Sequence, residues 1–236
     1  MDSRFTRTGL LLGEEGMKIL NQSKVAVFGI GGVGSFACEA LVRSGLGKIV
    51  IIDYDIIDIT NINRQIHANS KTIGLSKVKV MKDRLLDINP TLDIMAIDEK
   101  YTDDSRERLI SLDYDYVVDA IDMVSSKINL IESSKRLNIP IISCMGAGNK
   151  LNPTMFQVGD IYETNTCPLA KVMRKELRKR QIKNLKVVWS REKPMNVNLE
   201  KEGLRKAVPG STSFVPSVAG LILASEVIKD LVFGGV

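Results

Sequence analysis

Short runs of apolar residues alternate along the chain with longer segments in which apolar positions recur every three or four residues. Each short run is typical of a buried strand, and each longer segment of an amphipathic helix. The predicted strands are 24–28, 48–53, 92–97, 116–121 and 139–144. The predicted helices are a first stretch up to residue 23, broken at Gly13 and Gly16, and then 33–44, 74–89 and 125–137. This alternation predicts an α/β fold with a Rossmann-like, doubly wound, mostly parallel sheet.

The pattern changes after Gly148. Two more strands, 154–161 and 186–190, flank a basic helix, and a final helix is predicted for 216–232. No linker or repeat interrupts the chain, so we expect one domain over 1–236. It consists of a first part, about 1–148, and a C-terminal extension, about 149–236.

A glycine-rich turn joins the first strand to the following helix. It reads Gly29-Ile30-Gly31-Gly32-Val33-Gly34 and contains the G-x-G-x-x-G pattern. Glycines there let backbone N–H groups approach phosphate oxygens, and the helix N-terminus adds positive potential. Asp53 ends the next strand, where a carboxylate can accept ribose hydroxyls. Together they indicate a nucleotide site in the first part of the chain, but they fit a dinucleotide as well as ATP.

Further polar residues follow neighbouring strands. Asn61, Arg64 and Gln65 share one loop, Lys77 begins the next helix, and Asp122 follows the strand 116–121. The carboxyl ends of parallel strands share one crevice, so these groups are expected to converge. Two cations and an amide suit a triphosphate, and Asp122 suits Mg²⁺. An NAD-dependent oxidoreductase would leave this set unexplained, and a nucleotide-binding module without catalysis would need neither Arg64 nor Asp122.

The formal net charge of +5 is concentrated in one stretch. Between Lys171 and Lys193, ten basic residues face two acidic ones, a net charge of +8. Cations at helical spacing predict a row that contacts RNA phosphates, and the alternative is a solvated helix face. The predicted RNA contacts are Lys171, Arg174, Lys175, Arg178 and Lys179.

Composition excludes several other kinds of site. Three cysteines without a C-x-x-C pair argue against a disulfide framework and a structural zinc site, and a single histidine, His67, cannot form a multi-histidine metal site. For His67 a structural role is preferred to that of a catalytic base. The chain has neither a signal-peptide pattern nor an apolar run of about 18 residues, so we expect a cytoplasmic protein without a membrane partner.

From residue 4 to 122 the sequence resembles the ubiquitin-activating-like, ThiF-type adenylating enzymes. The matching motifs, in order, are Arg4-Phe5-Thr6-Arg7, the glycine turn, Asp53-Tyr54-Asp55, Asn61 to Gln65, Gly74-Leu75-Ser76-Lys77, Ile88-Asn89-Pro90 and Asp119-Ala120-Ile121-Asp122. The resemblance implies that ATP and Mg²⁺ bind here, with Asp53 at the ribose, Asn61, Arg64 and Lys77 at the phosphates, and Asp122 at Mg²⁺; Asp55 and Gln65 are expected in the same site. It also implies a homodimer in which Arg7 enters the partner's site.

Other motifs are similar to the tRNA threonylcarbamoyladenosine dehydratase branch of that family. They are Arg64-Gln65-Ile66-His67-Ala68, Gly146-Ala147-Gly148, and Pro168-Leu169-Ala170 followed by the basic helix. This resemblance implies ATP-dependent cyclisation, with loss of water, of threonylcarbamoyladenosine beside the anticodon of tRNA, through activation of the threonyl carboxylate. The first part of the chain, about 1–148, is then expected to bind the nucleotide, and the C-terminal extension, about 149–236, to face the tRNA substrate. The alternative is adenylation of the C-terminus of a ubiquitin-like or sulfur-carrier protein, with a sulfur-transfer protein as a further candidate partner. Cys167 is expected to be a bystander rather than an acceptor thiol.

Overall fold

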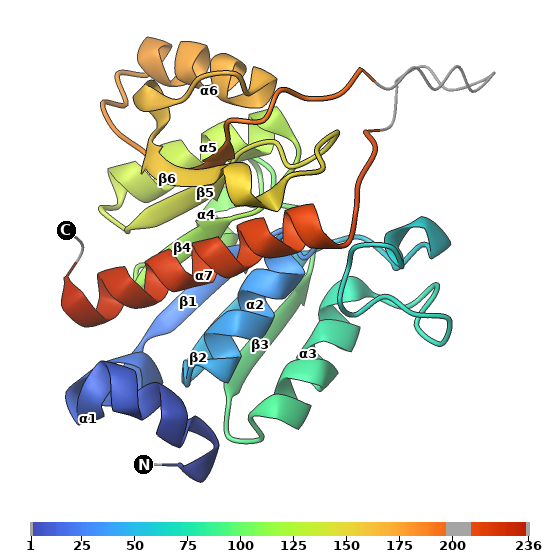
Figure 1. Ribbon diagram of the computed structural model, residues 1–236. Coiled ribbons are helices and arrows are strands. Elements are labelled where there is room, and N and C mark those ends of the chain that lie inside the picture. The colour runs from blue at the N-terminus through green and yellow to red at the C-terminus, as the bar shows by residue number, and fades with distance from the viewer. Residues whose placement is uncertain (1, 197–208, 235–236) are drawn as a thin grey trace.

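The computed structural model describes residues 2–196 and 209–234 (Figure 1). The helices are α1 (Thr6–Gln22), α2 (Gly34–Arg43), α3 (Lys77–Ile88), α4 (Arg106–Leu109), α5 (Val124–Arg136), α6 (Pro168–Lys179) and α7 (Phe214–Phe233). Short 3-10 turns are η1 (Ser3–Phe5), η2 (Ile59–Asn61), η3 (Pro153–Met155) and η4 (Ile161–Glu163). The strands are β1 (Lys24–Phe28), β2 (Lys48–Asp53), β3 (Asp93–Asp98), β4 (Tyr116–Asp119), β5 (Ile141–Cys144), β6 (Phe156–Asp160) and β7 (Lys186–Ser190).

These strands form one seven-stranded sheet in the order β3-β2-β1-β4-β5-β7-β6. Every neighbouring pair is parallel except β6 and β7, which are antiparallel. The chain builds outward from β1 toward β3, then returns to place β4 on the other side of β1, and this reversal opens a crevice at the carboxyl ends of β1 and β4. The predicted Rossmann-like sheet with a C-terminal extension is confirmed.

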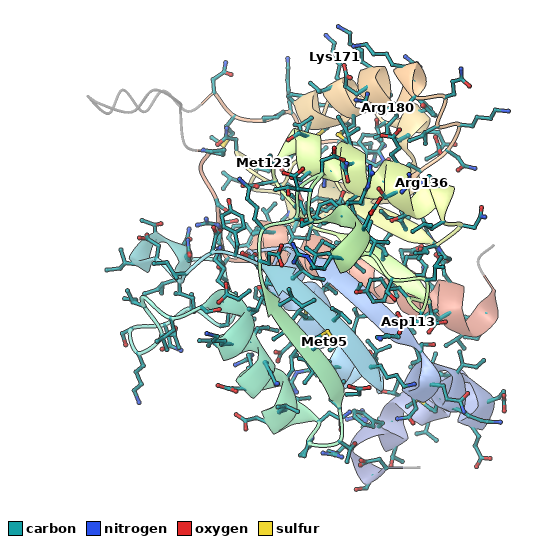
Figure 2. All side chains as sticks on the ribbon, turned by 180° about the vertical axis from the view of Figure 1, so that it is seen from behind. Met95, Asp113, Met123, Arg136, Lys171 and Arg180 are labelled. Carbon is teal, nitrogen blue, oxygen red and sulfur yellow. The ribbon has the colours of Figure 1, made fainter. Side chains whose placement is uncertain are left out.

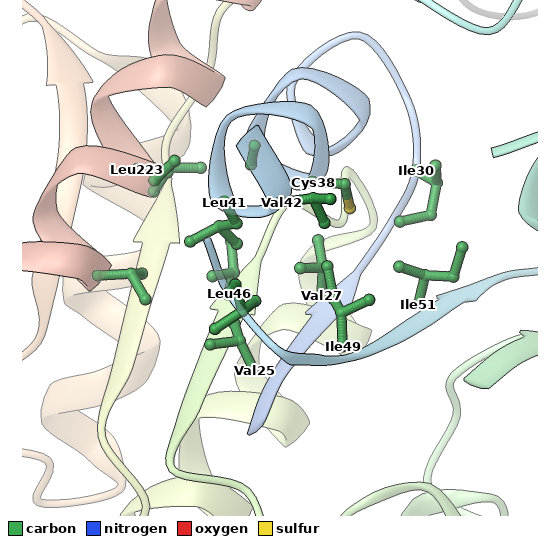
Figure 3. Packing of buried hydrophobic residues seen from close by; sticks show 14 of the residues in the cluster. Val25, Val27, Ile30, Cys38, Leu41, Val42, Leu46, Ile49, Ile51 and Leu223 are labelled. Carbon is green, nitrogen blue, oxygen red and sulfur yellow. The ribbon is translucent and has the colours of Figure 1, made fainter. Parts of the chain in front are cut away.

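Successive residues of the strands point to opposite faces of the sheet and pack into two hydrophobic cores, one on each face. On one face, Val25 and Val27 of β1 pack with α2, α3 and α7, as the close-up of this cluster shows (Figure 3). On the other face, Ala26 and Phe28 pack with residues of α5 and α6. Strands buried on both faces read as continuous apolar runs, which is why the sequence pattern located β1, β2, β4 and β5 so well.

Some element boundaries differ from the prediction for local reasons. The helix predicted from residue 74 begins at Lys77, because Gly74 has a φ of +83° and the preceding segment forms turns. The break predicted at Gly13 is present, with a φ of +72° inside α1. The break predicted at Gly16 is wrong: the residue is helical, and a side-chain Cβ there would lie 2.8 Å from Val232 of α7. That glycine allows α1 and α7 to pack closely.

Strands from both predicted parts of the chain, before and after residue 148, join the same sheet. The assignment of the first part to the nucleotide and the second to the substrate stays a prediction, and residues 197–208 of the second lie outside the described residues. Across the described residues, no helix combines the length and the apolar character that crossing a membrane requires.

Candidate functional site

A cavity of about 550 Å³ opens at the carboxyl ends of β1, β2, β4 and β5. It lies at the reversal of strand order, where ligands of doubly wound sheets bind. The structure brings nearly all the predicted nucleotide-site residues to its wall: Gly29, Gly31, Gly32, Asp53, Asp55, Asn61, Arg64, Gln65, Lys77 and Asp122. Gly34 is the exception, because it begins α2 behind the turn.

The glycines of the turn have different roles. Gly29 has a φ of +89°, and a Cβ there would lie 2.7 Å from the carbonyl oxygen of Ala120. At Gly34 a Cβ would lie 1.8 Å from the carbonyl oxygen of Gly29, which no real structure tolerates. A Cβ at Gly31, in contrast, would meet just one heavy atom within 4 Å among the described residues beyond its chain neighbours, the Nε2 of Gln65 at 4.0 Å. Gly29 and Gly34 are therefore needed to form the turn, whereas Gly31 leaves open space on the cavity side for a ligand.

Asp53 ties the glycine turn to the end of β2. Its carboxylate accepts the backbone N–H of Ile30 at 2.6 Å and that of Asp55 at 2.9 Å. Burial raises the pKa of Asp53 above its ordinary value, and the positive charge of Lys77 and these two hydrogen bonds act in the opposite direction. The two N–H donors fix the orientation of a carboxylate that still has lone pairs available for a ligand hydroxyl.

Two cations face the same cavity. Lys77 is buried, and its ammonium lies 2.6 Å from the carboxylate of the more exposed Asp55. The guanidinium of Arg64 donates to the carbonyl oxygen of Thr60 at 2.8 Å and to the Oδ1 of Asn63 at 2.9 Å. It pairs with no carboxylate among the described residues. A positive charge balanced only by neutral oxygens is well suited to a phosphate.

Two polar groups at the cavity lack partners within the part of the chain that the structure describes. The Oε1 of Gln65 is buried and accepts no hydrogen bond. Asp122 is exposed in the loop between β4 and α5 and forms no hydrogen bond or ion pair there. Magnesium is usually held by one or two carboxylates together with substrate phosphates and water. A single unpaired carboxylate beside two cations fits that arrangement.

Sequence reasoning missed several residues that line the cavity. Burial of Tyr54 raises the pKa of its phenol. The negative charges of the nearby Asp55, Asp122 and Asp53 raise this pKa further. The ammonium of Lys100 lies 5.1 Å from the centre of the Tyr54 ring. The remainder of this overlooked set includes Tyr101, Met145, Gly146, Ala147, Gly148, Leu169, Pro209, Gly210 and Ser211. Tyr54, Gly146-Ala147-Gly148 and Leu169 belong to motifs that the sequence analysis quoted without assigning them to the site, and Tyr101 and Met145 follow β3 and β5.

A family model described as ThiF family matches residues 5–233 of the chain. The chain belongs to the ThiF family. A curated relative, the tRNA threonylcarbamoyladenosine dehydratase of Bacillus subtilis, is 46% identical over 97% of this chain and 94% of its own length. Crystal structures of the Escherichia coli tRNA N6-threonylcarbamoyladenosine dehydratase are also similar. The complex with AMP has a TM-score of 0.89 and the complex with ATP 0.88, each at 35% identity over 97% of this chain and 93% of the other.

Three other residues singled out from the sequence of this ThiF-family protein lie away from the cavity wall. Arg7 is exposed on α1 and does not line the cavity of its own chain. Cys167 is buried at the N-terminus of α6, packed in the core beside α5. His67 is 2% exposed, neither ring nitrogen has a partner in the described residues, and burial lowers its pKa to about 4. A neutral, buried imidazole agrees with the structural role expected for it.

Helix α6 carries the basic residues on the outside of the molecule (Figure 2). Lys171 and Lys175 are exposed and have no carboxylate partner in the described part of the chain, and the guanidinium of Arg178 lies 5.1 Å from the centre of the Tyr162 ring. Arg174, in contrast, donates to the carbonyl oxygen of Thr164 at 2.8 Å and to that residue's hydroxyl. Lys179 pairs with Glu176 at 2.8 Å. In this ThiF-family protein, fewer basic side chains of α6 are therefore free to contact RNA than the helical spacing of the sequence predicts.

Proposed function

We propose that this protein is an ATP-dependent tRNA threonylcarbamoyladenosine dehydratase. The observation that carries the proposal is the cavity itself: a glycine turn open at Gly31, two cations, and the unpaired carboxylate of Asp122 at adjacent strand ends. Relatives that carry this name match the chain over nearly its whole length, and one of them has been crystallised with ATP and with AMP. This support makes the dehydratase preferable to an activator of a carrier protein.

ATP is consumed as a substrate in the proposed reaction. Asp53 accepts hydroxyls of the ribose, with Asn61, Gln65 and the glycine-turn amides around the nucleotide. Arg64 and Lys77 balance the negative charge of the phosphates. For this, the ammonium of Lys77 exchanges its ion pair with Asp55 for one with a phosphate. Mg²⁺ bound by Asp122 would supply further positive charge at the phosphates. The protein thus positions the substrates and stabilises charge, without a protein nucleophile.

The chemistry converts a carboxylate into an electrophile. An oxygen of the threonyl carboxylate attacks a phosphorus of ATP, and the rest of the polyphosphate leaves. A carbamoyl nitrogen or oxygen of the same group then attacks the activated carbonyl carbon and loses its proton to solvent, AMP or inorganic phosphate leaves, and a five-membered ring remains. Ring closure within one molecule has a large proximity advantage. Cys144 lies at the cavity, but burial raises the pKa of its thiol to about 12, so it is not a thiolate nucleophile.

The C-terminal extension is proposed to face the tRNA. Leu169, at the first turn of α6, lines the cavity, and the exposed Lys171 follows it on the same helix. If the modified nucleoside lies in the cavity, the phosphates that flank it in the tRNA would therefore lie near Lys171. Because the substrate is tRNA, we also place the enzyme in the cytoplasm. A sulfur-transfer partner stays a prediction that no described residue tests.

A homodimer with Arg7 acting in the partner's cavity is the further part of the proposal. The exposed apolar side chains of Leu10 and Leu11, 81% and 84% accessible on the same helix, support a contact between α1 and another surface. Arg7→Ala and Asp122→Asn variants should each be inactive alone. Mixed dimers contain one cavity in which both residues are intact, so mixing should restore up to about a quarter of the activity. No recovery after confirmed subunit exchange would reject action in trans.

The deciding experiment uses tRNA that carries threonylcarbamoyladenosine. We expect the protein, with ATP and Mg²⁺, to convert this nucleoside to a product lighter by one water in nucleoside mass spectrometry. Release of AMP would indicate an adenylate intermediate, and release of ADP would indicate an acyl phosphate. No mass change on tRNA, together with adenylation of a carrier protein's terminal glycine, would support the alternative activity instead.

A further inference from the structure

Two buried lysines lie beneath the ends of β4 and β5, and they are balanced differently. Lys127 of α5 pairs with the carboxylate of Asp119 at 2.8 Å, both side chains being fully buried. Lys150 is 3% exposed, and its ammonium donates to the carbonyl oxygen of Gly146 at 2.7 Å, with Gly148 O at 3.5 Å. No described carboxylate lies within ion-pair distance of Lys150. A buried charge without a counter-charge lowers the free energy of unfolding, so we expect the ammonium of Lys150 to have a function.

Lys150 orients the segment Gly146-Ala147-Gly148, called here the rim, which lines the cavity. The described chain contains no cis peptide bond, so the C=O of Gly146 and the N–H of Ala147 point in opposite directions. The carbonyl points at Lys150, which does not line the cavity, whereas Ala147 does line it. The N–H of Ala147 therefore points away from Lys150, and it has no acceptor among the described residues.

Lys127 has the same effect on the neighbouring strand end. Its ammonium donates to the carbonyl oxygen of Ile121 at 3.0 Å, so the N–H of Asp122, a residue that lines the cavity, points away from Lys127. This N–H also lacks an acceptor in the described part of the chain. Two free backbone donors at adjacent strand ends, with the charge of Lys150 behind one of them, form a site for an anionic oxygen.

The position of the rim indicates which anion binds there. The rim lies at the end of β5, and Asp53 with the glycine turn lies at the ends of β2 and β1, on the other side of β4. A Cβ on Gly146 would lie 3.7 Å from the Cβ of Leu169, so the rim adjoins the first turn of the basic helix. It stands between the nucleotide end of the cavity and the helix proposed to contact tRNA.

We propose that the rim binds the substrate carboxylate that is activated, and that Lys150 is the residue that positions it. This inference rests on the proposed dehydratase function. The N–H of Ala147 donates a hydrogen bond to one carboxylate oxygen, and the positive potential of Lys150 favours the negative charge of the carboxylate. The other oxygen is left to attack ATP, and the donor then stabilises the carbonyl oxygen on which charge develops during ring closure.

The test compares Lys150→Met, which removes the donor and the charge, with Lys150→Gln, which keeps an N–H donor. Ala147→Pro removes the rim N–H itself, at a residue that does not have a positive φ. Lys135→Met is the control, because that lysine donates to Asn184 at the far end of α5. Lys127→Met is the reference for a large loss of stability, since it leaves Asp119 buried and unpaired. Readouts are the single-turnover rate on modified tRNA, ATP and tRNA affinities, and Tm.

Lys150→Met and Ala147→Pro should lower the single-turnover rate about 10- to 100-fold, with both affinities within about twofold of the wild type. Lys150→Gln should recover most of the rate. An unchanged rate in Lys150→Met would overturn the proposal, as would an equal loss of ATP affinity. A large fall in Tm without rescue by Gln, as expected for Lys127→Met, would also overturn it. Absence of any conversion by the wild type would instead reject the dehydratase function.

Discussion

At the nucleotide end of the cavity, Asp53 and Lys77 are held by contacts within the chain, whereas the outermost lysines of helix α6 have no partner among the described residues. Asp53 accepts two backbone N–H groups, and Lys77 is buried against Asp55. Lys171 and Lys175 are exposed. Fixed groups act through their position, so single substitutions there should have large effects that depend little on salt. Mobile surface cations act through summed charge, so each contributes little and salt screens it.

The largest effect is expected at Asp122. Asp122→Asn should reduce conversion of the modified tRNA at least about 100-fold, because the amide is a poorer Mg²⁺ ligand. Its Tm should not change, since the carboxylate has no partner in the described residues. Mg²⁺ should raise the ATP affinity of the wild type but not of the variant. Asp104→Asn, an exposed carboxylate outside the cavity wall, is the matched control. Full activity of Asp122→Asn would reject the metal role.

The glycine turn gives the next effect and separates binding from folding. Gly31→Ala places a methyl group in open cavity space, so ATP affinity should fall about tenfold or more while Tm stays near the wild type. Gly34→Ala forces a Cβ to 1.8 Å from a backbone oxygen, and should lower the free energy of unfolding by about 3 kcal/mol or more. Calorimetric titration and thermal unfolding measure both. Equal losses of stability in the two variants would contradict the separate roles.

The nucleotide end could largely be predicted from the sequence, because its residues follow apolar runs in a parallel sheet. Asp53, Lys77 and Asp122 each lie beside a strand end, and strand ends of such a sheet meet. The rim and Lys150 could not be predicted as a site in this way. Nothing in the pattern of 145–150 shows that a lysine is buried, or that it turns carbonyl groups away from the cavity. That information exists only once β5 and its neighbours are assembled.

The basic helix illustrates a second limit of sequence reasoning. Spacing alone counted Arg174 as a free cation, whereas it holds the loop before α6 through Thr164. Thr166 in that loop has a φ of +62°, so the chain folds back and brings Thr164 toward the helix. A helical repeat reports which residues share a face, but it does not report which loops pack against that face. The pairing of Lys179 with Glu176, three residues away, was visible in the sequence.

On α6 we therefore expect a smaller effect that depends on salt. The double variant Lys171→Glu with Lys175→Glu should weaken tRNA binding about tenfold and lower the log–log salt slope by about two. ATP affinity and Tm should not change. Reversal of Lys79 and Lys82 on α3 is the control, because that helix lies at the opposite edge of the sheet (Figure 1). Binding that is unchanged, or a loss that does not vary with salt, would leave α6 as a solvated face.

The last effect concerns the stability of the fold in acid. A histidine in the unfolded chain titrates near pH 6.5, whereas burial lowers the pKa of folded His67 to about 4. Between these values the unfolded state binds a proton that the folded state excludes. The free energy of unfolding therefore rises with pH across this window, and His67 destabilises the fold as pH falls from about 6.5 to about 4.

His67→Leu removes this titration without losing a hydrogen bond, since neither ring nitrogen has a partner in the described residues. Between pH 7 and pH 4.5, the free energy of unfolding of the wild type should fall by on the order of 2 kcal/mol more than that of the variant. Urea unfolding of both proteins at the two pH values measures the difference, and all other titrating groups cancel. His67 lies in the loop that carries Arg64 and Gln65, so acid should increase amide exchange there before it does so in α6. Identical pH dependence in the two proteins would mean that His67 has the same pKa in the folded and unfolded chain, and would reject the effect of burial.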